Sequence, residues 1–365
     1  ARDLAGHRGE SVILVGPRQA PAVHALAAIL NTALGATGST VAYAPEPDSG
    51  RPSHLDALKE LASAIQSGEV STLLILGGNP AYDGPADLGF ADLLAKLPLS
   101  IHLSLYDDET SQRCSWHLPR AHTLESWGDG RAWDGSVTTR QPLIEPLYGG
   151  RSDLEVLALA LGDGVESGYE LVRREMLEAA EETDREEFWR RALHDGVVEA
   201  SAWDHVTPRA RPGDLAVAVD AFRELLDADR PTAERPELVL VADPRVHDGR
   251  FANNGWLQEL PDALTKITWD NALLLSPATA RDMGLSSGEI AEVSVGGSTI
   301  EVPCYLLPGQ GRNSLTVSLG YGRTAAGQVG NGVGVNAYVL RSSSAPDVIS
   351  SASVRATGRS YPLAT

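Results

Sequence analysis

The pattern of apolar residues changes once along this chain of 365 residues, near residue 237. Before that point, short apolar runs that end in Gly or Pro alternate with segments whose apolar residues have helical spacing. After it, short apolar runs follow one another, separated by Gly, Pro and Asn. Strand–helix alternation predicts a parallel sheet covered by helices, whereas a series of short strands predicts a sandwich or a barrel. We therefore expect two architectures in one chain.

Four strands are predicted in the first part, each an apolar run that closes on a turn. They are SVILVGPRQ (11–19), STVAYA (39–44), STLLILGGNPAYD (71–83) and LSIHLSLY (99–106). Helices are predicted between them at 21–35 and 54–70, where Leu55, Leu58, Leu61 and Ile65 share one face. We expect residues 1–230 to form an α/β domain with a doubly wound, Rossmann-like parallel sheet.

An acidic helical region is predicted at about 166–228, within this first domain. Residues that would form an inner apolar stripe are Val172, Met176, Ala179, Ala180, Trp189 and Leu193. Such a region either binds a partner or packs on the α/β layer with its charges in solvent. Charged runs on helices are usually solvent faces, so we favour packing.

The second part, residues 237–365, is predicted to be a closed or nearly closed β-barrel after a linker at 231–236. Its strands are expected in LVLVAD, NALLLSP, IAEVSVGGSTIEVPCYLLPG and NSLTVSLGYG. Within VSVGGSTIEV, Gly296 and Gly297 are placed as the turn of a hairpin. The glycine-rich stretch GQVGNGVGVN (327–336) is predicted to form turns and bulges, because it does not follow a first Rossmann strand.

Composition excludes several classes of function. The net charge of −19 at pH 7 repels nucleic acid and anionic lipid. No apolar run is long enough to cross a membrane, so direct membrane insertion is not expected. The two cysteines, Cys114 and Cys304, form no CxxC motif, so this chain cannot by itself ligate an iron–sulfur cluster or a cysteine-rich zinc site. We expect buried thiols, and the sequence leaves their pairing open.

The turn GGNP (77–80) follows a predicted parallel strand, at the sheet edge where α/β proteins bind ligands. Gly77 and Gly78 would let a phosphate or a base approach the backbone, and the Asn79 amide could read a base edge before Pro80. A tight turn without a ligand explains these four residues equally well.

The segment 109–156 concentrates groups suited to acid–base or metal chemistry. They are Glu109, His117, His122, Glu125, Asp129 and Asp134. His117 and His122 are five residues apart, which is poor spacing for a metal pair on a helix, and Pro119 between them favours a loop. We favour a long ordered loop pinned by Trp127, Trp133 and carboxylate–backbone hydrogen bonds.

The segment FANNGWLQELPDALTKITWDN (251–271) is too polar for a core strand and too rich in Trp for a plain loop. We expect it to lead into the barrel across the α/β domain. Trp256 and Trp269 would fill the gap between the domains, and Asn253, Asn254 and Gln258 would hydrogen-bond the backbone. Loss of a buried Trp256 side chain would cost about 3–5 kcal/mol.

These motifs together resemble the molybdopterin oxidoreductase (DMSO reductase) superfamily. The resemblance is carried by GGNP, by HLPRAHTLESWGDGRAWDGSVTTRQPLIEPLYGG and by PATARDMGLSSGEIAEVSVGGSTIEVPCYLLPG. It implies a C-terminal double-psi-type barrel and a GxNP turn beside a pterin guanine dinucleotide. By this resemblance the candidate cofactor-binding residues are Gly77, Gly78, Asn79, Pro80, Glu125, Asn253, Asn254 and Trp256.

A narrower resemblance covers nearly the whole chain. HDGRFANNGWLQELPDALTKITWDNALLLSPATA, LTVSLGYGRTAAGQVGNGVGVNAY and SYPLAT look like the molybdopterin-like half of the large iron–sulfur subunit of alternative complex III, a bacterial quinol:electron-acceptor oxidoreductase. That resemblance implies no molybdenum cofactor and no catalytic residue in this chain. It also implies a periplasmic position on a membrane complex.

The expected partners follow from the same resemblance. They are an adjoining iron–sulfur, ferredoxin-like domain, an integral membrane quinol-binding subunit and cytochrome c subunits. Both ends of the chain look cut, so the iron–sulfur clusters are expected only outside it. The alternative is a cofactor-binding fragment of a catalytic molybdenum or tungsten oxidoreductase that holds a bis-pterin guanine dinucleotide.

Overall fold

The computed structural model describes residues 1–164, 167–178, 184–209, 211–227, 230–350 and 352–365. The chain divides into two compact units. Unit 1 comprises residues 1–51 and 121–229, and unit 2 comprises residues 52–120 and 230–365. Both units are thus built from two separate stretches of chain, whereas the sequence suggested consecutive domains at 1–230 and 237–365.

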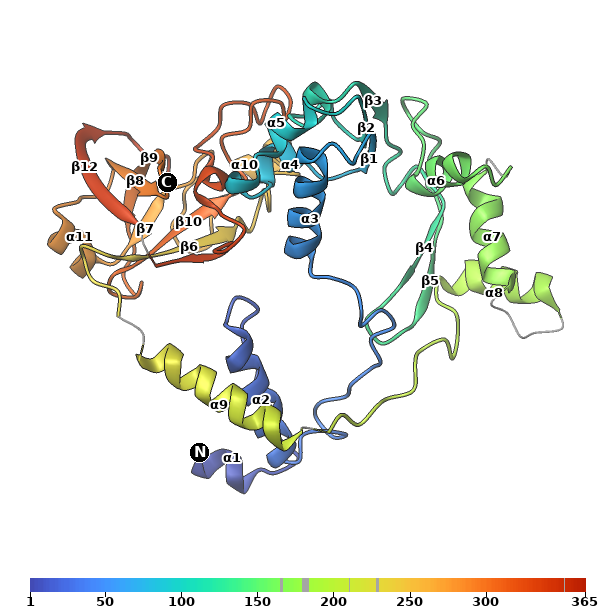
Figure 1. The fold of residues 1–365 in the computed structure, drawn as a ribbon, viewed down its shortest axis with the longest axis horizontal. Coiled ribbons are helices and arrows are strands. Elements are labelled where there is room, and N and C mark those ends of the chain that lie inside the picture. Colours follow the sequence, from blue (N-terminus) through green and yellow to red (C-terminus); the bar gives the residue numbers. More distant parts are fainter. Residues whose placement is uncertain (165–166, 179–183, 210, 228–229, 351) are drawn as a thin grey trace. The chain divides into compact units, whose positions relative to one another are not determined.

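Unit 1 is mostly helical. Its elements are α1 (Arg2–Gly6), α2 (Pro21–Ala33), β4 (Gly128–Arg131), β5 (Val137–Arg140), α6 (Asp153–Leu161), α7 (Gly168–Glu178), α8 (Arg185–Asp195) and α9 (Pro212–Asp227). Helices α2 and α9 pack side by side (Figure 1). Strands β4 and β5 form an antiparallel hairpin. Trp133 lies near its tip and is 92% exposed, so the prediction that Trp133 pins this loop is wrong.

Two of the four predicted strands do not form. Residues 11–16 and 39–44 make no ladder among the described residues, and Tyr43 has only an isolated bridge to Val206. The Asn31 side chain instead holds the backbone of Ile13, through Ile13 N–H to Oδ1 (2.8 Å) and Nδ2 to the Ile13 carbonyl (2.9 Å). An apolar run becomes a strand only where a neighbouring strand satisfies its backbone. The described parallel sheet is therefore smaller than a doubly wound one.

The acidic helical region buries its predicted inner stripe, but it does so within unit 1, against α6 and the β4–β5 hairpin, and not, as the sequence predicted, on the parallel sheet. Val172 and Met176 on α7 and Trp189 on α8 are buried in one cluster, and Leu193 packs against it. Trp127 and Tyr169 add ring contacts to Trp189, with centroids 6.3 Å and 5.7 Å away. Ala179 and Ala180, predicted for the same stripe, lie outside the described residues. The charged side chains consequently form the outer face of a packed pair of helices.

Unit 2 begins with a parallel three-stranded sheet of order β1-β2-β3. Its elements are α3 (His54–Gln66), β1 (Thr72–Leu76), α4 (Pro80–Asp83), η1 (Ala86–Leu88), α5 (Phe90–Leu94), β2 (Leu99–Ser104), η2 (Ser111–Arg113) and β3 (Trp116–Pro119). Strands β1 and β2 confirm the predictions at 71–83 and 99–106. A core of Ala62, Ile65, Phe90, Leu93 and Leu94 joins α3 and α5 to the sheet.

The rest of unit 2 is a mixed seven-stranded sheet of order β11-β6-β10-β7-β9-β8-β12, which curls as a half-barrel (Figure 1). Its elements are β6 (Glu237–Ala242), α10 (Gly255–Glu259), β7 (Leu273–Leu275), α11 (Pro277–Met283), β8 (Glu289–Val295), β9 (Ser298–Leu306), β10 (Ser314–Leu319), η3 (Ala337–Leu340), β11 (Val348–Ile349) and β12 (Ser353–Ser360). The predicted hairpin is confirmed, because Val295 pairs with Ser298 and both intervening glycines have positive φ.

The interior of this sheet is filled by alternating aliphatic side chains. Leu238 and Leu240 from β6, Leu273 and Leu275 from β7, and Val317 from β10 are each at most 1% exposed. Alternate residues of a strand point to one face, so this pattern places one face of the sheet in the core. Tyr82 from α4 belongs to the same cluster and donates its hydroxyl proton to the Tyr321 carbonyl oxygen at 2.7 Å. The two sheets of unit 2 therefore share a packed contact.

The 251–271 segment lies wholly in unit 2, and only part of its predicted role is correct. Asn253 accepts from the Val329 N–H (3.0 Å), Asn254 caps α10, and Gln258 donates to the Ala252 carbonyl (2.9 Å). Trp256, however, is 89% exposed. The helix α10 directs Gln258 inward, and Trp256 on the same short helix is left in solvent. The prediction that Trp256 fills a gap is wrong.

Trp256→Ala is therefore expected to change the free energy of unfolding by no more than about 0.5 kcal/mol. A side chain that is already in water loses neither packing nor burial when it is truncated. Chemical denaturation of the two proteins, followed by circular dichroism, measures the difference. A loss of several kcal/mol would contradict the exposed position.

Candidate functional site

The loop after β1 turns sharply through two successive glycines. Gly77 and Gly78 have φ of 70° and 74°, a region that favours glycine. The Gly77 N–H donates to the Leu103 carbonyl at 2.8 Å, which holds the turn against β2. The Arg120 guanidinium occupies the space that a side chain at Gly77 would need, 2.4 Å from an ideal Cβ. Pro80 then begins α4, so the four residues of GGNP form a turn between a strand and a helix.

Asn79 lies at the end of this turn, and its amide makes three hydrogen bonds inside the protein. Its Nδ2 donates to Glu109 at 2.8 Å. Its Oδ1 accepts from the Thr110 N–H (3.1 Å) and from the Thr110 hydroxyl (2.7 Å). Thr110 is fully buried and its Oγ1 accepts from the Ala81 N–H (3.0 Å). The side chain that the sequence suggested could read a base instead fastens the loop after β2 to the loop after β1.

Glu109 meets Arg323, which lies beyond the carboxyl end of β10. The Nη2 atom of Arg323 is 2.7 Å from Oε2, and Nε lies 2.9 Å from Oε1. The side chains are only 7% and 12% exposed. Glu109 also accepts from the backbone N–H groups of Thr324 (2.8 Å) and Ala325 (2.9 Å), and Arg323 donates to the Gly249 carbonyl. One buried carboxylate thus joins loops that follow a strand in each sheet of unit 2.

The partners of Glu109 determine its charge. Burial alone would raise the pKa of Glu109, but hydrogen bonds from Arg323, Asn79 and the Ala325 N–H outweigh it. Together they lower the pKa from 4.5 to about 2. The carboxylate is therefore ionised in the folded protein across the whole neutral and mildly acidic range. Arg323 also lies over the Tyr82 ring, 4.7 Å from its centroid, in a cation–π contact.

A depressed pKa makes the stability of the protein depend on pH. The stabilisation from Glu109 is fully present above pH 4.5 and is lost as the pH falls from 4.5 through about 2. We expect Glu109→Gln to destabilise the protein near neutral pH and to differ less and less from wild type below pH 4.5. Unfolding free energies at about pH 6 and about pH 3 measure this convergence. Glu292→Gln, at an exposed ion pair with Arg355, is the control; a constant difference for Glu109→Gln at both pH values would contradict the assignment.

Beside this network is a cleft of about 240 Å³. Its charged lining residues are Asp83, Asp108, Arg120, Asp248, Arg250 and Arg323. Burial and the nearby Asp248 raise the pKa of Asp83 to about 7. Arg250 and Asp248 pair at 2.6 Å. The cleft therefore combines equal numbers of acidic and basic side chains, and several of them are already paired.

Two histidines belong to a hydrogen-bond chain beside Asp108, one of the residues that line the cleft. The fully buried His102 has its Nδ1 2.8 Å from the Ser111 hydroxyl, which lies 2.9 Å from Nδ1 of His117. Asp108 accepts from the N–H groups of Thr110 and Ser111 and lies 3.5 Å from His102. Burial lowers the pKa of His102. His117, predicted as a possible acid–base group, therefore serves a buried hydrogen-bond chain.

The other predicted residues lie apart from this network. Glu125 belongs to unit 1 and accepts from the His122 N–H (2.9 Å) and the Leu147 N–H (3.4 Å). Asp134, also in unit 1, accepts from the Ser136 N–H. These carboxylate–backbone hydrogen bonds agree with the prediction, but 109–156 is not one long loop, because it contains η2, β3, β4, β5 and the start of α6. Asn253 and Asn254 hold the backbone of unit 2, as described above, and Asp129 lies on β4.

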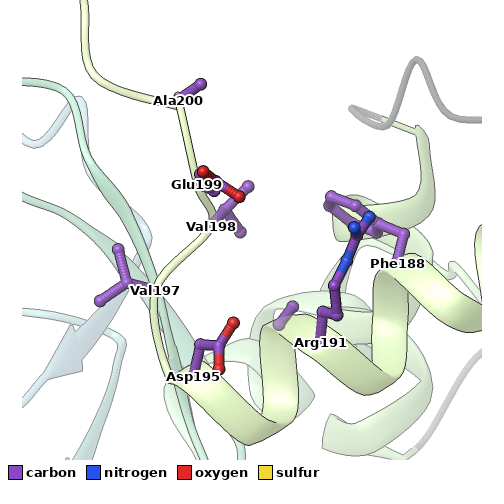
Figure 2. Close-up of a pocket in the computed structure, with 8 residues that line it drawn as sticks. Phe188, Arg191, Asp195, Val197, Val198, Glu199 and Ala200 are labelled. Carbon is purple, nitrogen blue, oxygen red and sulfur yellow. The ribbon is translucent and has the colours of Figure 1, made fainter.

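Unit 1 has a pocket of about 210 Å³ of its own. Figure 2 shows Phe188 and Arg191 on α8 on one side, with Val198 and Glu199 on the other. Arg191, Asp195 and Glu199, which line it, are exposed. Salt screens interactions between exposed charges, so this pocket supplies little electrostatic selectivity.

Sequence reasoning missed Arg323, Thr110 and Tyr82. The stretch LGYGR follows a predicted strand, so Arg323 had the same strand-end signal that identified GGNP. Its partner Glu109 lies 214 positions earlier, and a single sequence carries no signal for such a pairing. In the described parts of the chain, no three or more His, Cys, Asp or Glu side chains are grouped to hold a metal ion. Cys114 and Cys304 are both free thiols, and Cys304 is buried.

Comparison with known proteins gives distant relatives, and no family model matches the chain. The menaquinone reductase molybdopterin-binding-like subunit of Nitratidesulfovibrio vulgaris is 26% identical over 296 residues, which are 76% of this chain and 40% of that protein. A subunit of NADH-quinone oxidoreductase, from Mycobacterium bovis and from Mycobacterium tuberculosis, is 27% identical over 248 residues, 66% of this chain and 26% of that protein. The chain thus spans less than half the length of these curated relatives.

Among solved structures, acetylene hydratase from Pelobacter acetylenicus has a similar fold, with a TM-score of 0.53 at 17% sequence identity. The match covers 82% of this chain and 46% of that one. Across the described residues, no helix is both long and apolar enough to cross a membrane. The chain therefore resembles, at 26–27% identity, proteins named as subunits of quinone-linked oxidoreductases, and it shares the fold of acetylene hydratase.

Proposed function

We propose that the chain is a non-catalytic, molybdopterin-oxidoreductase-like scaffold in a quinone-linked respiratory complex. Its curated relatives are named as subunits of quinone oxidoreductases, which supports a role beside partner subunits. In this proposal it holds an adjoining iron–sulfur domain next to an integral membrane quinol-binding subunit and cytochrome c subunits. The complex would be of the alternative complex III type, with the chain at the periplasmic face of a bacterial membrane.

The observation that carries the proposal is that Asn79 and Arg323, two polar side chains at the cleft, are already engaged inside the protein. Asn79 makes three hydrogen bonds within the protein, and Arg323 is held by Glu109 and by the Gly249 carbonyl. A cofactor could recruit Asn79 or Arg323 only by breaking these buried contacts. Breaking a buried ion pair costs about 3–5 kcal/mol, which the cofactor would have to recover.

The cleft is also a poor fit for a pterin guanine dinucleotide. Its volume of about 240 Å³ is below the roughly 300–1,000 Å³ of ordinary small-molecule sites. Three acidic and three basic side chains line it, and Arg250 and Arg323 are already paired with Asp248 and Glu109, so the lining offers a diphosphate no excess of positive charge. This volume and this lining support the proposal of a domain that has the fold of a cofactor enzyme without its chemistry.

We also propose that the half-barrel of unit 2 is the double-psi-type barrel implied by the family resemblance. Parallel pairing of β10 with β6 and of β7 with β9 inside an otherwise antiparallel sheet supports this assignment. Such a mixed barrel presents loops at strand ends, and one of these loops carries Arg323.

A variant that blocks the cleft tests the proposal. Leu105 lines the cleft, is 49% exposed and takes no part in the hydrogen-bond network, so Leu105→Trp would fill the space. For a scaffold, we expect quinol oxidation by the assembled complex to stay within about twofold of wild type. The matched control is Leu118→Trp, on β3 at 36% exposure and not part of the cleft lining. Loss of turnover with normal assembly in Leu105→Trp alone would favour the alternative, a catalytic bis-pterin site.

A further inference from the structure

The cleft beside the GGNP turn holds a carboxyl group that the fold itself does not bind. Asp83, the last residue of α4, lines the cleft and is half-buried. Among the residues that the structure describes, its side chain has no hydrogen-bond or ion-pair partner. Half-buried polar groups normally find such partners, so this carboxyl is available to a ligand that enters the cleft.

Two arginines of the cleft are held by other carboxylates. Arg250 pairs with Asp248 at 2.6 Å. Arg323 pairs with Glu109 at 2.7 Å. Their positive charges are therefore already balanced, and neither arginine is an ion-pair partner of Asp83.

The remaining arginines nearby are also directed elsewhere. The Arg120 guanidinium lies against Gly77, behind the turn. Arg341 lies 3.9 Å from the Asp347 carboxylate, and it donates to the backbone carbonyl of Asp83 rather than to the side chain. A cation that enters the cleft would thus meet the Asp83 carboxylate without displacing a partner from it.

The surroundings of Asp83 make its ionisation costly without a cation. Burial, and then the charge of Asp248, raise the pKa of Asp83 to about 7. Asp108 raises it further, whereas Arg341 and Arg323 lower it without compensating. Since the ordinary pKa is 3.8, the folded state loses stability as the pH rises from 3.8 through about 7. A carboxyl group in a cleft that costs stability at neutral pH is typical of a binding site rather than of a structural contact.

The other walls of the cleft suit the stem of a small organic cation. Leu105 and Tyr106 line it and are 49% and 44% exposed, so they offer aliphatic and aromatic surface. An aromatic ring also attracts a cation. The volume of about 240 Å³ lies below the roughly 300–1,000 Å³ of sites for drug-sized molecules. A ligand with few atoms, or a single long side chain, therefore fits.

We propose that this cleft binds an organic cation, a guanidinium or primary ammonium group on a short apolar stem, with Asp83 as its counter-ion. The cation donates charge-assisted hydrogen bonds to the carboxylate, and the stem lies against Leu105 and Tyr106. A free molecule and an Arg or Lys side chain of a partner subunit present this same group. The inference goes beyond the proposed function and does not depend on it, because every residue of the site belongs to unit 2.

The test compares a charged probe with an uncharged one of similar shape. Ligand-detected NMR titration of the full chain at about pH 8 should show butylguanidinium binding at least about tenfold more tightly than butylurea. Asp83→Asn should remove this preference. Asp107→Asn is the matched control, because Asp107 is exposed and lies outside the cleft lining, and it should keep the preference. Equal binding of the two probes to wild type, or an unchanged preference in Asp83→Asn, would overturn the proposal.

The pH dependence of binding identifies the carboxyl group. Only the ionised side chain pairs with the probe, so its affinity follows the ionised fraction of a group whose pKa is about 7. The affinity for butylguanidinium should rise about tenfold between about pH 6 and about pH 8. Asp83→Asn should abolish this rise. An affinity that stays constant over this range in wild type would contradict the assignment to Asp83.

Two further variants separate loss of binding from loss of folding. Asp83→Asn removes an unfavourable charge and no hydrogen bond, so its thermal unfolding temperature should not fall below that of wild type at about pH 8. Leu105→Trp, which fills the cleft, should also lose the probe. Leu118→Trp, outside the lining, should retain it. Retention of full affinity in a folded Leu105→Trp chain would place the probe elsewhere and overturn the proposal.

The assembled complex distinguishes the two sources of the cation. If a partner's side chain fills the cleft, the complex purified from native membranes should bind butylguanidinium at least about tenfold more weakly than the isolated chain. Equal affinity in both assigns the site to a free organic cation. Both outcomes support a cation site at Asp83. None of these measurements uses quinol oxidation, so failure of this proposal leaves the proposed function standing.

Discussion

Arg323→Met is expected to lower the free energy of unfolding by about 3–5 kcal/mol, because it leaves the Glu109 carboxylate buried without its counter-ion. Both side chains are almost fully enclosed, at 7% and 12% exposure. The substitution preserves most of the aliphatic volume of Arg323, so the loss reports the charge and its hydrogen bonds rather than a cavity. Urea denaturation at neutral pH measures it.

The double variant Glu109→Gln, Arg323→Met separates the pair from its surroundings. Removing both charges should recover part of the loss, because no uncompensated ion remains. Arg355→Met is the control: its pair with Glu292 has the arginine 72% exposed, and such pairs contribute at most about 1 kcal/mol. Equal losses for Arg323→Met and Arg355→Met would show that the buried pair does not hold the loops of unit 2 together.

The second large effect is expected one residue earlier. Gly322 has a φ of 66°, and a Cβ there would lie 2.1 Å from the Asn336 nitrogen and 2.7 Å from the Val335 carbonyl carbon. Both are backbone atoms, so the loop itself must move. Gly322→Ala should therefore cost about 2–5 kcal/mol, the sum of a left-handed conformation and an overpacked contact. Displacement of this loop would also move Arg323 away from Glu109.

Gly332 provides a matched comparison on the same glycine-rich loop. Its φ is 72°, but nothing lies within 4 Å of an added Cβ. Gly332→Ala should cost only the conformational term, about 1–2 kcal/mol. Thermal and urea unfolding of the two variants measure the difference. A similar cost at both positions would mean that close approach of the 333–336 backbone is not what requires glycine at 322.

Strands were predicted correctly where a segment has both the apolar pattern of a strand and a neighbouring strand to pair with. Strands β1, β2, β6, β7, β8, β9 and β10 lie in the predicted runs, and the Gly296–Gly297 hairpin has the predicted register. Residues 11–16 have an equally apolar pattern, yet Leu14 is 85% exposed and Ile13 is bound by the Asn31 side chain. A strand needs a partner as well as propensity, and the pattern of one segment does not report its partner.

Less of the candidate site could be predicted. The GGNP turn was placed correctly, because glycine pairs after a parallel strand have a local conformational cause. What Asn79 binds was not predictable, because Thr110 and Glu109 lie about thirty residues away, and Arg323, which pairs with Glu109, follows a strand of the other sheet. Trp256 shows the reverse error: hydrophobic character suggested burial, but the capping Asn254 and the inward Gln258 leave the Trp256 ring outside. Side-chain direction in a short irregular segment depends on such local anchors.

The central claim, that this chain keeps the fold of a cofactor enzyme without the cofactor, is tested most directly by composition. The complex that contains the chain, purified from native membranes, would be analysed for molybdenum, tungsten and acid-released pterin per chain. We predict none of the three above background, with iron present from an adjoining domain. Molybdenum or tungsten in stoichiometric amount together with pterin would contradict the account, and the cleft beside Gly77, Gly78 and Asn79 would then have to open to admit the group.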